Sequence, residues 1–91
     1  MVDIEFDQAK SDQNEQKRGL SFSRVADFDF ETALIERDGR IDYGEDRWIA
    51  LGLIGRRAFV VAFTWRNARL RVISFRKANA RESENYAQAQ P

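Results

Sequence analysis

Residues 47–76 read RWIALGLIGRRAFVVAFTWRNARLRVISFR, and this stretch predicts the centre of the fold. Runs rich in β-branched and aromatic residues alternate with short polar connections, which is typical of a strand meander. Strands are predicted at Arg47–Ile54, Ala58–Trp65 and Arg69–Phe75. Both connections have hairpin length, and Asn67 in the second tolerates the left-handed backbone that tight turns need.

Alternation along these strands divides their side chains between two faces. The smaller residues, such as Ala50, Gly52, Ala62 and Ser74, are expected on an exposed surface, although small residues also let a helix approach closely. The larger residues are expected to form the core, and they are Ile49, Leu51, Leu53, Phe59, Val61, Phe63, Trp65, Ile73 and Phe75.

Two helices are predicted before the meander. Asp7 caps a helix over Gln8–Arg18 that Gly19 ends, and its lack of an apolar face indicates a peripheral element. Ser21 then caps a second, short helix, and the spacing of its apolar residues favours packing on the sheet. That apolar stripe consists of Phe22, Val25, Ala26 and Phe28.

The remaining elements complete one domain over residues 1–91. Ala33–Glu36 is a short strand candidate, and Asn79 with Glu82 has the spacing of a capping box that starts a C-terminal helix to about Gln88. Residues 88–91 are expected to fray. The predicted fold is therefore α+β, with a small antiparallel meander sheet of three to four strands, two N-terminal helices and one C-terminal helix.

Charge is sorted along the chain although the formal net charge is zero. Residues 1–46 hold thirteen acidic and six basic side chains, whereas residues 47–81 hold nine basic side chains and no acidic one. Aromatic residues are interleaved with these arginines, which favours a surface that contacts phosphates and stacks on bases. Solvated strand faces and ion pairs with the acidic half are the structural alternative.

The absence of His and Cys removes several chemistries. Disulfides, thiolate nucleophiles, Cys/His zinc sites and imidazole acid–base catalysis are all excluded. The acidic run 42–46 lacks the oxygen-ligand pattern of a calcium loop, so no metal and no cofactor is expected. No apolar run is long enough for a signal peptide or a membrane span, so a cytoplasmic protein without a membrane partner is expected.

A basic surface of this kind can bind nucleic acid, and it can also cleave RNA. The ribose 2′-hydroxyl is an internal nucleophile, so the protein has to orient it, take its proton and stabilise the phosphate charge. Arginine suits the last task because its planar guanidinium pairs with two phosphate oxygens. Glu45 is the candidate base, and its structural alternative is a surface ion pair with Arg47 or Arg40.

Several motifs resemble the BrnT family of bacterial toxins from type II toxin-antitoxin pairs. They are Asp42-Tyr-Gly-Glu-Asp-Arg47, Arg71-Val-Ile-Ser-Phe-Arg-Lys-Ala-Asn79, Arg81-Glu82, Tyr86, Asp7-x-x-Lys10, Asn14, Lys17-x-Gly19-x-Ser21-Phe22 and Phe28-Asp29, in order along nearly the whole chain. The resemblance implies a fold like the RelE ribonuclease toxins and metal-independent RNA cleavage that inhibits translation. It also implies a complex with a BrnA-type ribbon-helix-helix antitoxin, through which alone the protein contacts promoter DNA.

The resemblance also implies roles for single residues. Glu45, Arg47, Arg71 and Arg76 form the expected catalytic set, and Lys17, Arg57 and Lys77 are expected phosphate contacts of the RNA. Arg56, Arg66 and Arg69 are expected at turns and solvated. Where the family commonly shows Lys-His-Gly, this chain has Lys17-Arg18-Gly19, which leaves weakened cleavage as an alternative.

Two alternatives remain open from the sequence. Arg71 and Arg76 have opposite parity, so either the strand bulges or ends near Ser74, or only one of them is catalytic. In addition, the basic face suits a non-catalytic protein that docks an acidic antitoxin segment and supports promoter repression.

Overall fold

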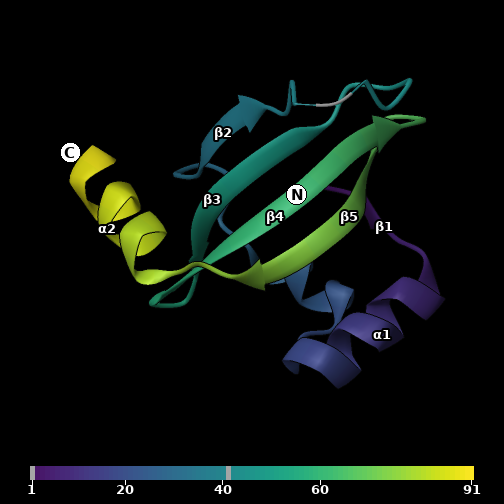
Figure 1. Cartoon of the computed structure of the whole chain (residues 1–91), viewed down its shortest axis with the longest axis horizontal. Coiled ribbons are helices and arrows are strands. Elements are labelled where there is room, and N and C mark those ends of the chain that lie inside the picture. Colours follow the sequence, from purple (N-terminus) through teal and green to yellow (C-terminus); the bar gives the residue numbers. More distant parts are fainter. Residues whose placement is uncertain (1, 41) are drawn as a thin grey trace.

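The computed structural model describes residues 2–40 and 42–91. Within these residues the chain forms a five-stranded sheet of order β1-β5-β4-β3-β2, two α-helices and one 3₁₀ helix (Figure 1). The elements are β1 (Ile4–Glu5), α1 (Gln8–Arg18), η1 (Phe22–Asp27), β2 (Leu34–Arg37), β3 (Trp48–Ile54), β4 (Arg57–Arg66), β5 (Arg69–Lys77) and α2 (Ala80–Ala89).

The α+β class and the β3-β4-β5 meander are confirmed, but the sheet is larger than predicted and is mixed. β2 adds antiparallel to β3, as its strand pattern indicated. β1, which was not predicted, pairs with β5 in parallel, with Ile4 opposite Leu70. A two-residue strand has no measurable alternation, so sequence periodicity could not find it.

The core lies on one face of the sheet, and only part of the predicted core set belongs to it. Its strand residues are Ala50, Phe59, Val61, Phe63, Leu70, Val72 and Phe75. In β3 the small-residue face is the buried one, because Ala50 lies opposite Val61 and Gly52 opposite Phe59. The predicted core residues of β3, namely Ile49, Leu51 and Leu53, therefore lie on the other face, where they pack on Ala58, Val60 and Ala78.

Helix η1 explains why the small residues of β3 are covered. A Cβ on Gly52 would lie 2.7 Å from Phe28 Cζ and 3.2 Å from Asp29 O, so the chain after η1 sits directly on this glycine. The predicted second helix is a 3₁₀ helix with three residues per turn. That period aligns Phe22, Val25 and Phe28, which are buried, and leaves Ala26 exposed.

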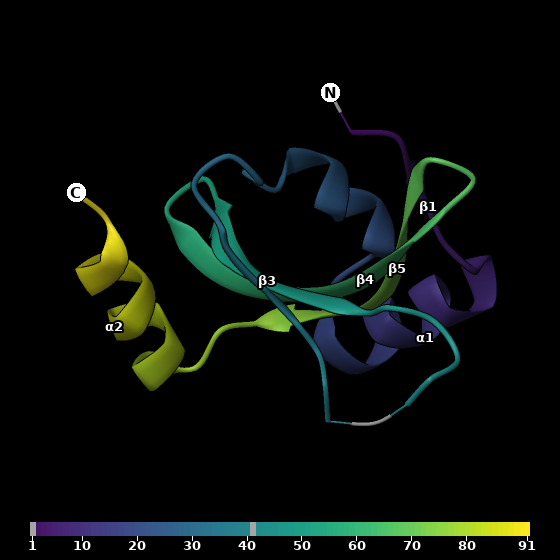
Figure 2. The ribbon, with the colours of Figure 1, turned by 90° about the horizontal axis from the view of Figure 1, so that it is seen from above.

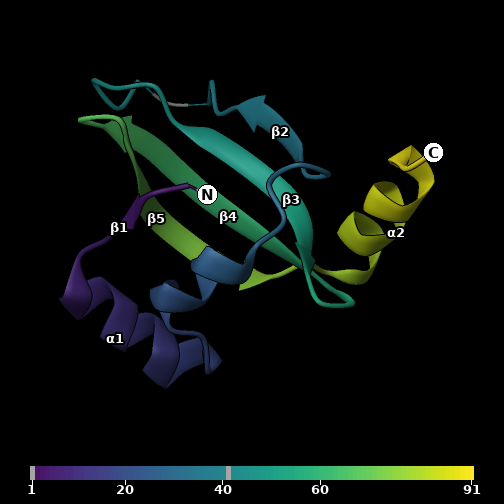
Figure 3. The same cartoon turned by 180° about the vertical axis from the view of Figure 1, so that it is seen from behind.

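The other helices lie at opposite ends of the molecule (Figures 1 and 3). Asp7 and Gly19 cap α1 as predicted, and within this fully described helix only Ser11 is buried. The capping box of Asn79 and Glu82 is confirmed, and α2 continues one residue beyond the predicted end, to Ala89. Gln90 then donates from its side chain to Thr32 O and Tyr86 O.

Candidate active site

A bulge in β5 places Arg71 and Arg76 on the same face of the sheet. Arg71 lies opposite Thr64 and Arg76 lies opposite Val60, and these two β4 residues share a face because they are four positions apart. The register shifts between Ala62 and Phe63, which leaves Ile73 as the extra residue. Of the alternatives that the sequence left open, a bulge near Ser74 is the one that the strand register shows. We call the side that carries Arg47, Arg66, Arg71 and Arg76, opposite the core, the basic face.

Glu45 reaches this face from the loop between β2 and β3, which lies on the opposite side of the sheet from η1 (Figure 2). Gly44 has a φ of 75°, which glycine adopts without a side-chain clash, and its N–H donates to Asp42 at 2.9 Å. Thr64, buried in β4, donates its hydroxyl to Asp46 O at 2.6 Å. These contacts hold the loop backbone on both sides of Glu45.

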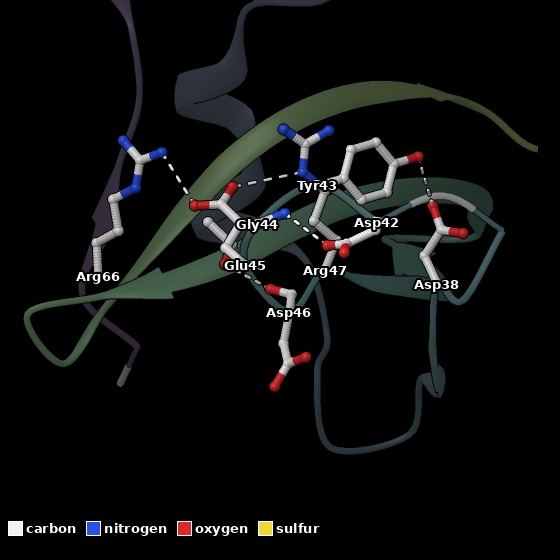
Figure 4. Close-up of polar contacts among 9 residues, drawn as sticks. Asp38, Asp42, Tyr43, Gly44, Glu45, Asp46, Arg47 and Arg66 are labelled. Atoms are coloured by element: carbon white, nitrogen blue, oxygen red, sulfur yellow. Dashed lines mark hydrogen bonds and ion pairs between the residues drawn. The ribbon is translucent and has the colours of Figure 1, made fainter.

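Two arginines hold the Glu45 carboxylate (Figure 4). Arg66 Nη2 donates to Oε1 at 3.1 Å and Arg47 Nε donates to Oε2 at 3.4 Å. The Glu45 side chain is only 27% exposed. Hydrogen bonding from Arg66, with a smaller contribution from Arg47, lowers the pKa of Glu45 below its ordinary value. Glu45 is therefore ionised and oriented at neutral pH.

Arg47 is itself fixed by an aromatic ring. Its guanidinium carbon lies 3.8 Å from the centroid of the Tyr43 ring, which is a cation–π contact. The Tyr43 hydroxyl donates to Asp38 at 3.3 Å, and Asp38 also accepts from Arg40. Arg40 holds the pKa of Asp38 at about 2, so this loop carboxylate stays charged. Arg40 thus pairs with Asp38 and not with Glu45.

Arg71 completes the same end of the basic face. It lies opposite Thr64, whose hydroxyl contacts the backbone of Asp46, next to Glu45. Its own carboxylate partner is Glu5 of β1, with 3.7 Å between Nη1 and Oε1. Because that distance is long and Arg71 is 28% exposed, its guanidinium retains donors for a ligand.

Arg76 stands farther along the face and is fully engaged. It donates to both oxygens of Glu82 at 2.8 and 2.9 Å, in a bidentate pair that raises the pKa of Arg76. Four strand positions separate its partner Val60 from Thr64, the partner of Arg71, which is about 13 Å along β4. Arg76 is therefore apart from the cluster at Glu45.

The sequence profile described as "Ribonuclease toxin, BrnT, of type II toxin-antitoxin system" matches residues 6–82. The chain belongs to the BrnT family. No curated protein sequence matched it significantly. A BrnT-family chain is a ribonuclease toxin, and a type II system pairs the toxin with a protein antitoxin.

The predicted phosphate contacts of this BrnT-family chain are dispersed. Lys17 is exposed on α1 and lines a groove of about 300 Å³ with Ile73 and Ser74, beside the bulge. Lys77 lies opposite Phe59, so its parity is that of the core face, and Arg57 shares it. Lys17 thus adjoins the basic face, whereas Arg57 and Lys77 do not join it.

Sequence inspection missed the contacts that three residues near this cluster make. Arg66 is not a free turn residue, because it holds Glu45, and Arg69 is paired with Asp3 and Glu5. Tyr43 was visible in the motif before Glu45, but its stacking on Arg47 depends on the loop fold. The alternation of β4 could have placed Arg66 with Thr64, although only the register brings Glu45 within reach.

Other features of this BrnT-family chain have structural explanations. Tyr86 is buried, and its hydroxyl lies 2.8 Å from Thr32 Oγ1, so it holds α2 to the chain before β2. Among residues 2–40 and 42–91, no group of three or more acidic side chains is arranged to hold a metal ion. Over the same described ranges, no helix is both long and apolar enough to cross a membrane.

Proposed function

We propose that this chain cleaves RNA by attack of a ribose 2′-hydroxyl on the adjacent phosphate, without a metal ion, and so inhibits translation. Glu45 pairs with Arg47 at the end of the basic face where Arg71 lies opposite Thr64, and this arrangement carries the proposal. Glu45 and Arg47 come from the loop that leads into β3, where Arg47 O accepts from Asp38 N at 2.8 Å, and Arg71 comes from β5. The resulting pair of functions, a carboxylate base beside fixed positive charge, is what the reaction requires.

The proposed step moves one proton to Glu45. The carboxylate accepts the 2′-hydroxyl proton while the O2′–P bond forms and the P–O5′ bond breaks. The leaving O5′ takes a proton from water, which gives a 2′,3′-cyclic phosphate and a 5′-hydroxyl. Arg47 and Arg71 stabilise the additional negative charge on the phosphate, and they remain charged throughout.

The electrostatics of Glu45 are consistent with a base that strengthens when the substrate binds. In the free chain its pKa lies below the ordinary value, so the carboxylate is ionised but only weakly basic. A phosphate placed beside it adds a like charge and competes for the arginine donors. Both effects raise the pKa of the carboxylate toward the range that general bases use.

Arg76 and Lys17 are assigned to phosphates that flank the cleaved one. The positions of Arg71 and Arg76 lie roughly 13 Å apart, and their guanidinium groups turn to different carboxylates, Glu5 and Glu82. A flanking phosphate would replace Glu82 as the ligand of the Arg76 fork. Lys17 borders the groove beside Ser74, and Ser74 lies between Arg71 and Arg76 along β5.

The partner is assigned to the same surface. A type II toxin is inhibited by a protein antitoxin, and we assign to this chain a BrnA-type ribbon-helix-helix antitoxin whose complex binds its promoter. An acidic antitoxin segment over the basic face would block RNA. The product of the adjacent gene is expected to form a complex stable on gel filtration; two separate peaks at low and high salt would contradict this assignment.

The cleavage test compares RNA with DNA of the same sequence in the presence of EDTA. RNA cleavage with cyclic-phosphate ends and intact DNA is expected. Glu45→Gln and Arg71→Ala should each reduce the rate by roughly 10²–10³-fold. The matched control is Arg56→Ala, an exposed arginine in the β3–β4 turn that should cleave at the wild-type rate.

The outcomes separate the two functions. Cleavage that stops in EDTA, or equal cleavage of DNA, would show that the 2′-hydroxyl mechanism is wrong. A folded wild-type chain that leaves RNA intact and does not arrest growth would instead support the non-catalytic, antitoxin-docking function. Growth arrest that Arg71→Ala abolishes, with the fold retained, supports the ribonuclease.

A further inference from the structure

Arg66 contacts the candidate base more closely than Arg47 does. Its Nη2 lies 3.1 Å from Glu45 Oε1, whereas Arg47 Nε lies 3.4 Å from Oε2. Arg66 comes from β4 and Arg47 from the residue before β3, so two separate segments hold the two oxygens of one carboxylate. Such a two-sided contact fixes the direction of the carboxylate as well as its charge.

The surroundings of Arg66 direct it to Glu45. Arg66 lies directly opposite Arg69 in the β4–β5 hairpin, and like charges in that position destabilise a sheet. Arg69 is neutralised on its other side by Asp3 and Glu5, at 3.9 and 3.5 Å. Glu45 does the same for Arg66, so each arginine of the pair turns toward its own acid.

The hairpin turn also restricts Arg66. The two residues that follow it, Asn67 and Ala68, have φ values of 52° and 63°, which makes a tight two-residue turn. Arg66 itself is 50% exposed. Figure 4 shows its second terminal nitrogen directed away from Glu45. Donors therefore remain for a phosphate while Nη2 stays on the carboxylate.

Resting on the proposed function, we propose that Arg66 is a positioning residue for RNA cleavage, which holds the Glu45 carboxylate in the orientation needed to accept the 2′-hydroxyl proton. Arg66 acts through Glu45, so its removal should affect the rate of the chemical step more than the binding of RNA. An ion pair that served stability alone would have no such effect on cleavage.

The charges that face Glu45 define the expected pH dependence. They are Arg66 from β4 and Arg47 from the residue before β3, with Tyr43 and the acids Asp42 and Asp46 on its own loop. With Arg66 removed, one positive charge and one hydrogen bond are lost. The carboxylate then protonates at a higher pH, and the acid limb of the cleavage profile moves in the same direction.

The test uses Arg66→Ala, Arg66→Lys and the control Arg56→Ala in the full chain, with the same RNA as in the cleavage test. The pKa of Glu45 is followed by carboxyl NMR in the free protein, and kcat and KM are followed against pH. For Arg66→Ala we expect a raised Glu45 pKa, a matching shift of the acid limb, and a kcat lowered about 10–100-fold. KM should change less than threefold, and Arg66→Lys should recover the pKa more fully than kcat.

The results distinguish this inference from the function on which it rests. Wild-type protein that cleaves no RNA overturns the proposed function. If wild-type protein cleaves and Glu45→Gln does not, while Arg66→Ala keeps the wild-type kcat and acid limb, the positioning role is wrong. An unchanged Glu45 pKa in folded Arg66→Ala overturns it as well, and so does a defect confined to KM.

Discussion

Glu82 joins the C-terminal helix to the sheet through its charge, and Glu82→Gln measures that contribution. The carboxylate accepts from Arg76 Nη1 and Nη2 at 2.8 and 2.9 Å, and from the backbone N–H of Asn79 at 2.9 Å. Glutamine keeps an oxygen for the Asn79 N–H but removes the negative charge that faces Arg76. The substitution therefore tests the ion pair while the helix cap remains.

The expected magnitude follows from the pKa of Glu82. Hydrogen bonding from Arg76 is the largest of the causes that lower this pKa from 4.5 to about 2. A lowering of this size corresponds to roughly 3 kcal/mol without screening. The side chains of Arg76 and Glu82 are 38% and 27% exposed, so solvent reduces the contribution. We expect Glu82→Gln to lower the free energy of unfolding by about 1–2 kcal/mol at pH 7.

The sign of the pH dependence is fixed by the direction of the shift. The pKa is lower in the folded than in the unfolded state, so the stabilisation is present above about pH 4.5 and is lost as the pH falls through about 2. Urea unfolding, followed by tryptophan fluorescence, should show a difference in the free energy of unfolding between wild type and Glu82→Gln, and this difference should narrow below pH 4.5. The ion-pair explanation would be refuted by a difference in unfolding free energy of the same size at pH 7 and pH 3, or by no difference at pH 7.

Three further changes test the packing and the turns. Gly52→Ala should destabilise the fold by about 1–3 kcal/mol in urea unfolding, because its Cβ would lie 2.7 Å from Phe28 Cζ; wild-type stability would contradict the close approach. Ala68→Gly should stabilise by roughly 0.5–1 kcal/mol, since alanine is strained at a φ of 63°, and a lower thermal midpoint would contradict this. Tyr86→Phe should cost about 1 kcal/mol by removing the 2.8 Å contact with Thr32, and equal stability would show that contact to be unimportant.

Local signals in the sequence predicted the elements well, because caps and turns depend on a few neighbouring residues. Asp7 accepts from Lys10 N and Gly19 adopts a left-handed φ, as expected for the two ends of α1. Asn79 and Glu82 form their capping box. Asn67 has the positive φ that its hairpin needs. These features require no knowledge of distant contacts.

The faces of the sheet could not be predicted in the same way. Residue size suggested that Leu51 faces the core. The structure instead has Gly52 on the core face, because Phe28 and Asp29 pack against this glycine. The bulge at Ile73 then changes the parity of β5, so Val72 and Phe75 share one face. Which face a helix covers is a tertiary property, and it overrides the pattern of large and small side chains.

The candidate site was partly visible for a related reason. Glu45 and Arg47 are neighbours in sequence, and their predicted ion pair forms. The contacts of Arg66 with Glu45 and of Arg71 with Glu5 join segments that are far apart along the chain. Opposite charges in two such segments can pair in many ways, and only the strand register selects one.

The parallel strand β1 has a consequence for the order of folding. Arg69 donates to Ile4 O across 65 positions in the sequence, and the same pairing of β1 with β5 brings Arg71 to Glu5. Contacts at this separation form late, because the chain between them must be ordered first. During synthesis β1 has no partner until β5 has been made, and until the two strands pair, Arg69 and Arg71 both lack the carboxylate of Glu5. A partly folded chain is therefore more positive around this hairpin than the finished one, and the charge of the site is set by the closing of its last strand.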